Sequence, residues 1–347
     1  MKTVFVGLSG GVDSAVSAAL LKSEGYRVVG AFIKIWQPEF TECTWQEDRL
    51  DAMRVAAALG IPFKEIDLSE EYKNEVVTKM VEGYARGITP NPDVLCNSKI
   101  KFGPFAQWAF SEGADVIATG HYARTERVGN HTHLLRGGDE NKDQSYFLWQ
   151  LSEKDLSRVL FPVGTLTKTQ VRAHAERLRL PVAAKSDSQG LCFVGAVTIP
   201  QFLKQYISVD PGEVLDEHGT SIGVHEGAAL YTLGQRHGFN VDSTQTASTP
   251  YFVIATDIKK NTITVSSDRT KAARNIFSIT DTRWVDETPT FPLRAEGQVR
   301  YRSAAVPLTI SKNTKLEVKT EKEVIAASGQ SLVVYENDRV LGGGIIS

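Results

Sequence analysis

The feature that most constrains the fold is a glycine-rich turn near the start of the chain, Ser9-Gly10-Gly11-Val12-Asp13-Ser14. An apolar run at 3–8 precedes it and an alanine- and leucine-rich run at 15–21 follows it. This pattern predicts a buried strand, a tight turn and a helix that ends at Gly25. Such a turn offers backbone N–H groups to a phosphate at the positive end of the helix. Asp13 would repel a bare phosphate, so it indicates either a bound Mg²⁺ or a structural role.

Residues 1 to about 120 alternate strands and helices at the spacing of βαβ units. Further strands are expected at 28–33, 62–66 and 115–120, and further helices at 46–59, from 69 onward and at about 98–112. Ser69 is expected to cap its helix, because two glutamates follow it in the first turn. The pattern predicts an α/β fold with a doubly wound parallel sheet.

Ligands of such sheets bind at the carboxyl ends of the strands. Ser9, Ile33 and Gly120 fall at these ends, and His121 follows directly. His121 could simply cap a strand end, but its position beside the glycine-rich turn favours contact with a substrate.

A second candidate site lies at 89–97, where Pro90 and Pro92 predict a rigid, extended loop. Asp93 stands three residues before Cys96, which makes the two a candidate acid/base and nucleophile pair. Cys96 is equally well explained as a small buried hydrophobic residue. The residues alone leave both interpretations open.

The chain has three cysteines, with no CxxC pair and no secretory segment at its start, which favours a reducing compartment. Cys192 lies in a polar, loop-like stretch, where Lys185 could lower the pKa of its thiol if the fold brings them together. Nothing around Cys43 indicates chemistry.

The 39 basic residues against 41 acidic ones exclude a globally basic surface but not a local basic face. No apolar run approaches the length of a membrane span.

The composition changes after Cys192. Residues 200 to about 265 are short, glycine-rich segments that predict a small mixed or β domain, and short alternating strands from about 270 onward predict a small barrel. Alternation places Arg300 and Arg302 on one strand face. Such a face could simply be solvated, but on a barrel beside a catalytic domain we favour contact with phosphates.

The glycine-rich turn is not a Walker A loop, because no lysine lies in it. It resembles the SGGxDS signature of the PP-loop ATP pyrophosphatases. That resemblance implies that the loop holds the pyrophosphate of ATP while the α-phosphate is attacked, which yields an adenylated substrate and pyrophosphate.

Three motifs taken together, SGGVDS, NPDVLCN and SQGLCF, resemble the tRNA-specific 2-thiouridylases, which put sulfur on the wobble uridine of tRNA. Further segments resemble that family's tRNA contacts and central motifs, at 142–148, 223–228, 231–236, 300–302 and 328–330. The match covers nearly the whole chain. One departure is Ile33, where the family often has methionine, and the apolar contact to adenine survives that change. The resemblance implies a PP-loop catalytic domain at 1–199, a small tRNA-facing domain at 200–268 and a tRNA-binding β-barrel at 269–347.

The resemblance also implies a mechanism. Adenylation turns the base oxygen into a leaving group, Cys192 carries a persulfide, Cys96 is the nucleophile and Asp93 moves protons. The implied ATP contacts are Gly7, Leu8, Ser9, Gly10, Gly11, Val12, Asp13, Ser14, Ile33 and Gly120. The implied tRNA contacts are Asn91, Pro92, Asp93, His121, Asp143, Gln144, Ser145, Arg300, Tyr301 and Gln330. The target base would be flipped out of its stack.

The implied cofactors are ATP and Mg²⁺, with no metal fixed in the apo protein, and the implied partners are tRNA with a wobble uridine and a persulfide donor. The donor would be a cysteine desulfurase or a sulfur-relay protein. The implied location is the cytoplasm, and no membrane is expected as a partner. A small-molecule PP-loop enzyme, another PP-loop tRNA enzyme and a non-catalytic RNA-binding protein are the alternatives. None of them explains the paired cysteine motifs together with an intact SGGVDS.

Overall fold

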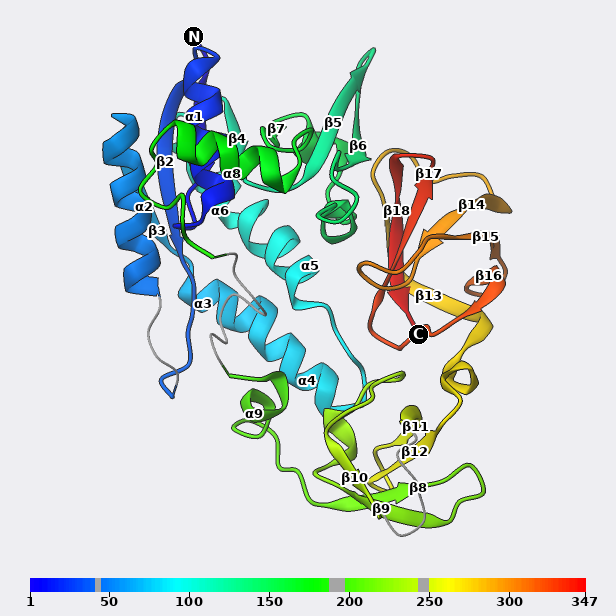
Figure 1. Ribbon diagram of the computed structural model, residues 1–347. Helices are drawn as coiled ribbons and strands as arrows, with labels where there is room; N and C mark the ends of the chain where they lie inside the picture. Colours follow the sequence, from blue (N-terminus) through cyan, green and yellow to red (C-terminus); the bar gives the residue numbers. More distant parts are fainter. Residues whose placement is uncertain (41–44, 187–196, 243–249) are drawn as a thin grey trace.

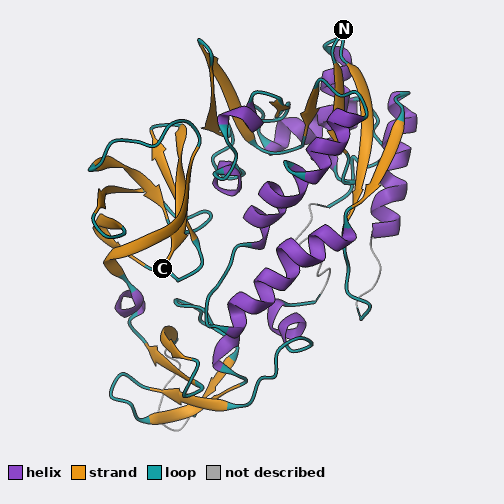
Figure 2. Cartoon of the chain, turned by 180° about the vertical axis from the view of Figure 1, so that it is seen from behind, coloured by secondary structure: helices purple, strands orange, loops and turns teal. Residues whose placement is uncertain are grey.

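The computed structural model describes residues 1–40, 45–186, 197–242 and 250–347. These residues form three sheets, arranged as an α/β layer, a small sheet and a barrel (Figure 1). Most helices gather around the first sheet, whereas the barrel is built from strands (Figure 2). None of the helices in these ranges combines the length and the apolarity that a membrane crossing requires.

The first sheet is parallel throughout and has the order β3-β2-β1-β4-β7. Its strands are β1 (Thr3–Gly7), β2 (Arg27–Lys34), β3 (Phe63–Asp67), β4 (Val116–Ala118) and β7 (Val159–Leu160). Val4 and Val6 belong to one buried cluster and Phe5 to another, so successive residues of β1 enter the cores on opposite faces. Because both faces are covered, β1 is apolar at consecutive positions. The predicted doubly wound parallel sheet is confirmed.

Helices cover both faces of this sheet. The cluster containing Val4 and Val6 is completed by α1 (Val12–Ser23), α2 (Trp45–Leu59) and α8 (Lys168–Arg177). The cluster containing Phe5 includes residues of α3 (Ser69–Tyr72), η1 (Lys73–Thr78), α4 (Lys79–Ala85), α5 (Pro92–Cys96), η2 (Asn97–Lys101) and α6 (Pro104–Ser111). Each helix that follows a parallel strand begins at the carboxyl edge of the sheet, so that edge collects helix N-termini.

Two of the predicted helices differ from the structure. Ser69 is the first residue of α3 and not its cap. In the described parts of the chain no side chain caps this helix, and Asp67 Oδ1 accepts a hydrogen bond from the Ser69 N–H at 3.0 Å. The single helix expected at about 98–112 is interrupted between η2 and α6. Pro104 explains the break, because proline has no N–H to donate and disfavours the helical conformation of the residue before it, Gly103.

The second sheet is small and mixed, as the composition predicts, with the order β10-β9-β8-β12-β11. The β8 and β12 strands are parallel, and the other pairs are antiparallel. The strands are β8 (Gly212–Leu215), β9 (Ser221–His225), β10 (Phe239–Val241), β11 (Phe252–Asp257) and β12 (Thr262–Ser266).

The third sheet is the predicted barrel, in the order β13-β16-β15-β14-β17-β18, closed by pairing of β13 with β18. Its strands are β13 (Arg274–Trp284), β14 (Leu293–Gln298), β15 (Val306–Lys312), β16 (Leu316–Val324), β17 (Ser331–Glu336) and β18 (Arg339–Ile346). A hairpin from the first half of the chain, β5 (Ala123–Val128) and β6 (His131–Arg136), extends this sheet through β6 and β18. The sequence pattern did not reveal this link between distant segments.

Arg300 and Arg302 do not lie on a strand face, contrary to the alternation pattern. Strand β14 ends at Gln298, and a turn follows in which the Ser303 N–H donates to Arg300 O at 3.0 Å. The side chain of Gln298 fixes this turn by donating from Nε2 to Ser303 O at 2.9 Å. Arg302 has a φ of 62°, so the chain reverses direction there.

Candidate active site

The glycine-rich turn connects β1 to α1 at the carboxyl edge of the first sheet. The Leu8 N–H donates to Ala31 O at 2.7 Å, which ties the end of β1 to β2. Helix α1 starts at Val12, and no side chain among the described residues caps it, so its first-turn N–H groups can bind an anion. The two serines shape the turn: the Ser9 N–H donates to Ser14 Oγ at 3.2 Å, and the Gly11 N–H donates to Ser9 Oγ at 3.3 Å.

Two glycines are required here by close packing. A Cβ atom at Gly10, where φ is +74°, would lie 2.4 Å from Asp48 O. A Cβ atom at Gly120 would lie 2.7 Å from Ser14 N. Gly120, just after the end of β4, therefore packs directly against the backbone of the turn, and any side chain at Gly120 would displace the turn.

Two adjoining cavities open beside the turn. One, of about 250 Å³, has the apolar residues Leu8, Ile33, Ile35 and Ile100 in its wall. The other, of about 420 Å³, is polar. Residues common to both are Ser9, Asp13, Cys96, Lys101, His121 and Gln144. The pair suits a ligand that has a flat apolar ring at one end and anionic groups at the other.

Cys96 and Asp93 lie on a helix, not on the extended loop that the two prolines predicted. Asn91 caps α5, because its Oδ1 accepts from the N–H groups of Asp93 at 3.2 Å and Val94 at 3.3 Å. Pro92 occupies the first helical position, where its missing N–H costs nothing. Asp93 and Cys96, three residues apart on one helix, share a face and line the polar cavity.

Both explanations of Cys96 have physical support. Cys96 is 6% exposed and belongs to the buried cluster around Phe5, yet it also lines both cavities. Burial raises the pKa of the Asp93 carboxyl, and the positive charge of Lys101 offsets part of that rise. A carboxyl with a raised pKa beside a thiol can exchange protons nearer to neutral pH.

His121 is buried between two aromatic rings. Its Nδ1 lies 2.8 Å from Thr119 Oγ1, and its ring centroid lies 5.9 Å from that of Phe102 and 6.0 Å from that of Phe161. Burial, together with the charge of Lys101, lowers its pKa well below the ordinary value for histidine. His121 is therefore a neutral ring in the cavity wall at neutral pH.

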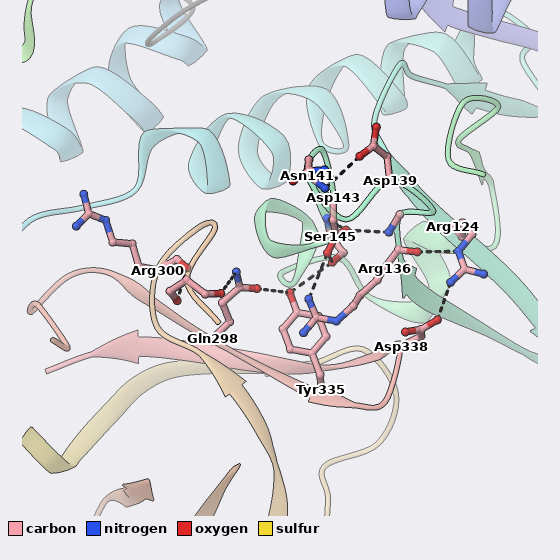
Figure 3. Close-up of polar contacts among 12 residues, drawn as sticks. Arg124, Arg136, Asp139, Asn141, Asp143, Ser145, Gln298, Arg300, Tyr335 and Asp338 are labelled. Atoms are coloured by element: carbon pink, nitrogen blue, oxygen red, sulfur yellow. Dashed lines mark hydrogen bonds and ion pairs between the residues drawn. The ribbon is translucent and has the colours of Figure 1, made fainter. Parts of the chain in front are cut away.

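The segment 143–145 divides its side chains between the cavities and the interior. Gln144 lines both cavities and accepts a hydrogen bond from the Tyr122 N–H at 3.0 Å. Asp143 instead accepts from the Gly137 N–H at 2.8 Å and pairs with Arg136 at 3.3 Å. Ser145 is fully buried and donates to Asp143 at 3.0 Å (Figure 3). Contact of Asp143 and Ser145 with tRNA stays a prediction, but in this structure both side chains are held within the protein.

The barrel residues expected to contact tRNA face two different spaces. Tyr301 packs on Phe147 with ring centroids 4.3 Å apart and, with Arg302, lines the polar cavity. Arg300 points away from the polar network around Tyr335 (Figure 3). Arg300 and Gln330 line a separate groove of about 790 Å³.

This separate groove is lined by residues from widely separated parts of the chain. Its wall includes Thr89, Arg236 and Arg269 in addition to the two barrel residues. Gln330 Nε2 donates to Thr89 O at 2.8 Å, which joins the barrel to the segment before α5. The barrel residues predicted to contact tRNA are therefore divided between two separate spaces.

Cys192 and Cys43 lie outside the described residues. Lys185, the residue expected to act on the Cys192 thiol, lies just before that gap. Its Nζ pairs with Asp48 at 2.8 Å and Asp51 at 2.7 Å. These carboxylates offset the charge of Lys185, so its effect on a nearby thiol would be weaker than the sequence suggested.

Among the described residues, the cations that line the polar cavity are Lys101, Lys142, Lys168, Lys185 and Arg302. The sequence pattern did not indicate Lys101 or Lys168. Lys168 contacts the turn directly, because its Nζ lies 2.7 Å from Asp13 Oδ1 and 2.9 Å from Asp13 Oδ2. No motif marks Lys168, because it lies 155 positions from Asp13 in sequence. Only its place at the start of a helix after a strand could have indicated it.

One group in the described parts of the chain has metal-ligating atoms within 4.8 Å of one another, namely His131, Glu153 and Asp286. It lies where the β5–β6 hairpin meets the barrel, and Arg339 pairs with Asp286. Arg339 therefore already supplies positive charge to this group, and none of the three residues lines either of the two cavities.

Three family models match consecutive parts of the chain. The tRNA methyl transferase HUP domain matches residues 2–196, the tRNA methyl transferase PRC-barrel domain 200–267 and the aminomethyltransferase beta-barrel domain 274–346.

Whole-length relatives give a sharper comparison. The chain is 43% identical over 357 residues to the tRNA-specific 2-thiouridylase MnmA 1 of Geobacillus kaustophilus, an alignment that covers 99% of this chain and 95% of that protein. It is 41% identical over 356 residues to the tRNA-specific 2-thiouridylase MnmA of Nitrosomonas eutropha, covering 99% and 98%. Among solved structures, the U34-tRNA thiolase NcsA of Methanococcus maripaludis has a TM-score of 0.37 and 20% identity, covering 55% of this chain and 60% of that one. A TM-score of that size supports no assignment.

Proposed function

The chain belongs to the family of tRNA-specific 2-thiouridylases, and we propose that it catalyses the ATP-dependent 2-thiolation of the wobble uridine of tRNA. The observation that carries this proposal is a shared cavity. The uncapped start of α1 and the pair Asp93 and Cys96 line the same polar space. A phosphate site and a thiol in one cavity match a reaction that first activates an oxygen and then replaces it by sulfur.

The first step is adenylation of the base. The turn from Gly7 to Ser14 would hold the β- and γ-phosphates on its N–H groups, and the apolar cavity with Ile33 would take the adenine. The uridine O2 attacks the α-phosphorus, the bond to the β-phosphate oxygen breaks, and pyrophosphate leaves. Gly120 contributes by supporting the turn from below.

We assign Mg²⁺ to the MgATP substrate, where it would neutralise phosphate charge. The carboxylate of the turn, Asp13, holds Lys168 on both of its oxygens. Both oxygens of Asp13 are therefore already paired with a cation, so we expect the phosphates of the substrate to be the main ligands of Mg²⁺.

The second step is sulfur transfer, in which Cys192 carries a persulfide and Cys96 attacks the Cys192 sulfur. The S–S bond to the outer sulfur breaks, that sulfur goes to C2 of the uridine, and a Cys96–Cys192 disulfide forms. AMP carries away the original oxygen, and an external reductant restores both thiols. Attack on C2 by released sulfide and attack by the persulfide itself both satisfy this balance. Asp93 would accept and return the proton of the Cys96 thiol.

We propose that Asn91, Pro92 and Asp93 receive the flipped base, beside His121 and Gln144 in the cavity wall. The surrounding tRNA would lie along the groove that Arg300 and Gln330 line, with Tyr301 nearer to the base. Asp143 and Ser145 would contribute to tRNA binding indirectly, because their hydrogen bonds hold the backbone on either side of Gln144.

The division into a catalytic domain at 1–199, a central domain at 200–268 and a barrel domain at 269–347 remains a proposal. The three described sheets fall one in each range, apart from the β5–β6 hairpin. A cysteine desulfurase or a sulfur-relay protein is the proposed donor, and the cytoplasm, where unmodified tRNA and reduced thiols coexist, is the proposed location.

The test is to incubate the protein with ATP, with and without tRNA bearing a wobble uridine, and to identify both the nucleotide products and the tRNA nucleosides. AMP, pyrophosphate and 2-thiouridine are expected together in the presence of tRNA and a persulfide donor. Formation of ADP and orthophosphate would refute the assignment to α-phosphate chemistry. AMP formation with a different modified nucleoside would favour another PP-loop tRNA enzyme.

A further inference from the structure

The phosphate turn of this chain has no lysine of its own, and the fold brings one to it. Lys168 is the first residue of α8, and Asp13 lies in the first turn of α1. Both helices belong to strand-helix units of the same parallel sheet, so both begin at its carboxyl edge. They also pack together, because Val171 and Ala175 of α8 share a buried cluster with the apolar face of α1.

The start of α8 is fixed independently of Asp13. Thr167 and Gln170 form a capping box, in which Thr167 Oγ1 accepts from the Gln170 N–H at 3.3 Å and Gln170 Oε1 accepts from the Thr167 N–H at 2.8 Å. The Lys168 N–H donates to Asp139 Oδ2 at 2.9 Å. The backbone of Lys168 is therefore anchored, and only its flexible side chain extends toward the turn.

The Lys168 side chain is 16% exposed and lines the polar cavity together with Ser9 and Gly11. Its ammonium group lies against both oxygens of Asp13, and the Tyr122 hydroxyl donates to Asp13 Oδ1 at 2.7 Å. Asp13 thus holds Lys168 beside the start of α1. Because the ammonium group of Lys168 offsets the negative charge of Asp13, a carboxylate can lie next to a phosphate site.

We propose that Lys168 is the pyrophosphate-binding cation of this enzyme, which Asp13 holds in place while no nucleotide is bound. The proposal rests on the proposed function, because it presumes that the turn receives the β- and γ-phosphates of ATP. A lysine ammonium is a compact charge on a flexible stem, so it can contact a phosphate oxygen while it stays near Asp13. Lys168 then has the role of the lysine that a Walker A loop carries within its own sequence.

The structural alternative is that Lys168 only neutralises Asp13 and touches no ligand. The two accounts differ in their dependence on the ligand and on Asp13. Direct contact affects only ligands that carry β- and γ-phosphates. Neutralisation alone makes Lys168 dispensable once Asp13 loses its charge.

The experiment measures equilibrium binding of AMP and of a non-cleavable ATP analogue with a methylene bridge between the α- and β-phosphates. For Lys168→Met we expect a loss of about 10- to 100-fold in affinity for the analogue, the size of a charge-assisted hydrogen bond, and no more than a two-fold change for AMP. Lys168→Arg should recover part of the loss. The matched control is Arg177→Met, which removes one positive charge from the far end of α8, about 14 Å along the helix, and should leave both affinities unchanged.

A double variant decides between the two accounts. Under direct contact, adding Asp13→Asn to Lys168→Met leaves the analogue weakly bound. Recovery of wild-type affinity in the double variant, or equal losses for AMP and the analogue in Lys168→Met, would overturn the proposal. Failure of the proposed function is distinguishable, since the wild-type protein itself would then not bind the analogue or would cleave ATP to ADP.

Discussion

Replacing Gly120 by alanine tests whether the end of β4 sets the position of the phosphate turn. The added methyl group would lie 2.7 Å from Ser14 N and 2.8 Å from Asp13 C, both backbone atoms. Reaching an ordinary separation of about 3.5 Å requires the turn to move by roughly 0.8 Å. Overpacking of this kind costs about 1–3 kcal/mol of stability. Because a displacement of about 1 Å can cost 100-fold in rate, we expect kcat/KM to fall roughly 10- to 100-fold.

The assay is the initial rate of pyrophosphate release with saturating tRNA, paired with urea unfolding. The matched control is Gly113→Ala, at φ +92°, where no atom of residues 1–40, 45–186, 197–242 and 250–347 lies within 4 Å of the new methyl group. Backbone strain there costs a similar 1–3 kcal/mol, by an order-of-magnitude estimate, but touches nothing near the turn. We expect both variants to lose stability and only Gly120→Ala to lose activity. Near wild-type pyrophosphate release by Gly120→Ala, or an equal loss in Gly113→Ala, would refute the reasoning.

Three further predictions use other parts of the site. Because the pKa of His121 is lowered in the folded protein, the unfolded chain binds a proton more readily than the folded one below about pH 6.5. The contribution of His121 to the free energy of unfolding should be fully present above that pH and fall toward pH 5 by up to about 1.4 kcal/mol per pH unit. Urea unfolding at several pH values should show a smaller fall in His121→Gln. Arg300→Ala should weaken tRNA binding and reduce the slope of log affinity against log salt by about 1, while ATP affinity holds; an unchanged slope would remove Arg300 from the tRNA surface. The sulfur transfer between Cys192 and Cys96 can be followed by mass spectrometry after one turnover. Cys96→Ser should still carry a persulfide on Cys192 but make no 2-thiouridine, Cys192→Ser should accept no sulfur, and Cys43→Ser should behave as wild type. A persulfide on Cys96 with Cys192 unmodified would reverse the assigned roles.

Local sequence determined the features that depend on near neighbours. The strand, turn and helix around Gly10 could be predicted because each residue there acts on its own backbone or on the next turn of helix. The alternation of strands and helices likewise predicted the parallel sheet, since the handedness of such units leaves few alternatives. The same reasoning failed at 91–96, because it weighed the stiffness of proline and overlooked that Asn91 followed by proline is also a helix start.

Only the tertiary structure decided which charges and surfaces meet. Lys168 reaches Asp13 across 155 positions, and this depends on the neighbouring order of strands in the sheet, which no local pattern encodes. The turn after β14 directs Arg300 to the separate groove and Arg302 to the polar cavity, although alternation placed them on one face. Likewise, β6 pairs with β18 through backbone hydrogen bonds, which carry almost no sequence signature. Residue types and their spacing thus indicated the class of chemistry, whereas the packing of distant elements determined which groups line the two cavities beside the turn.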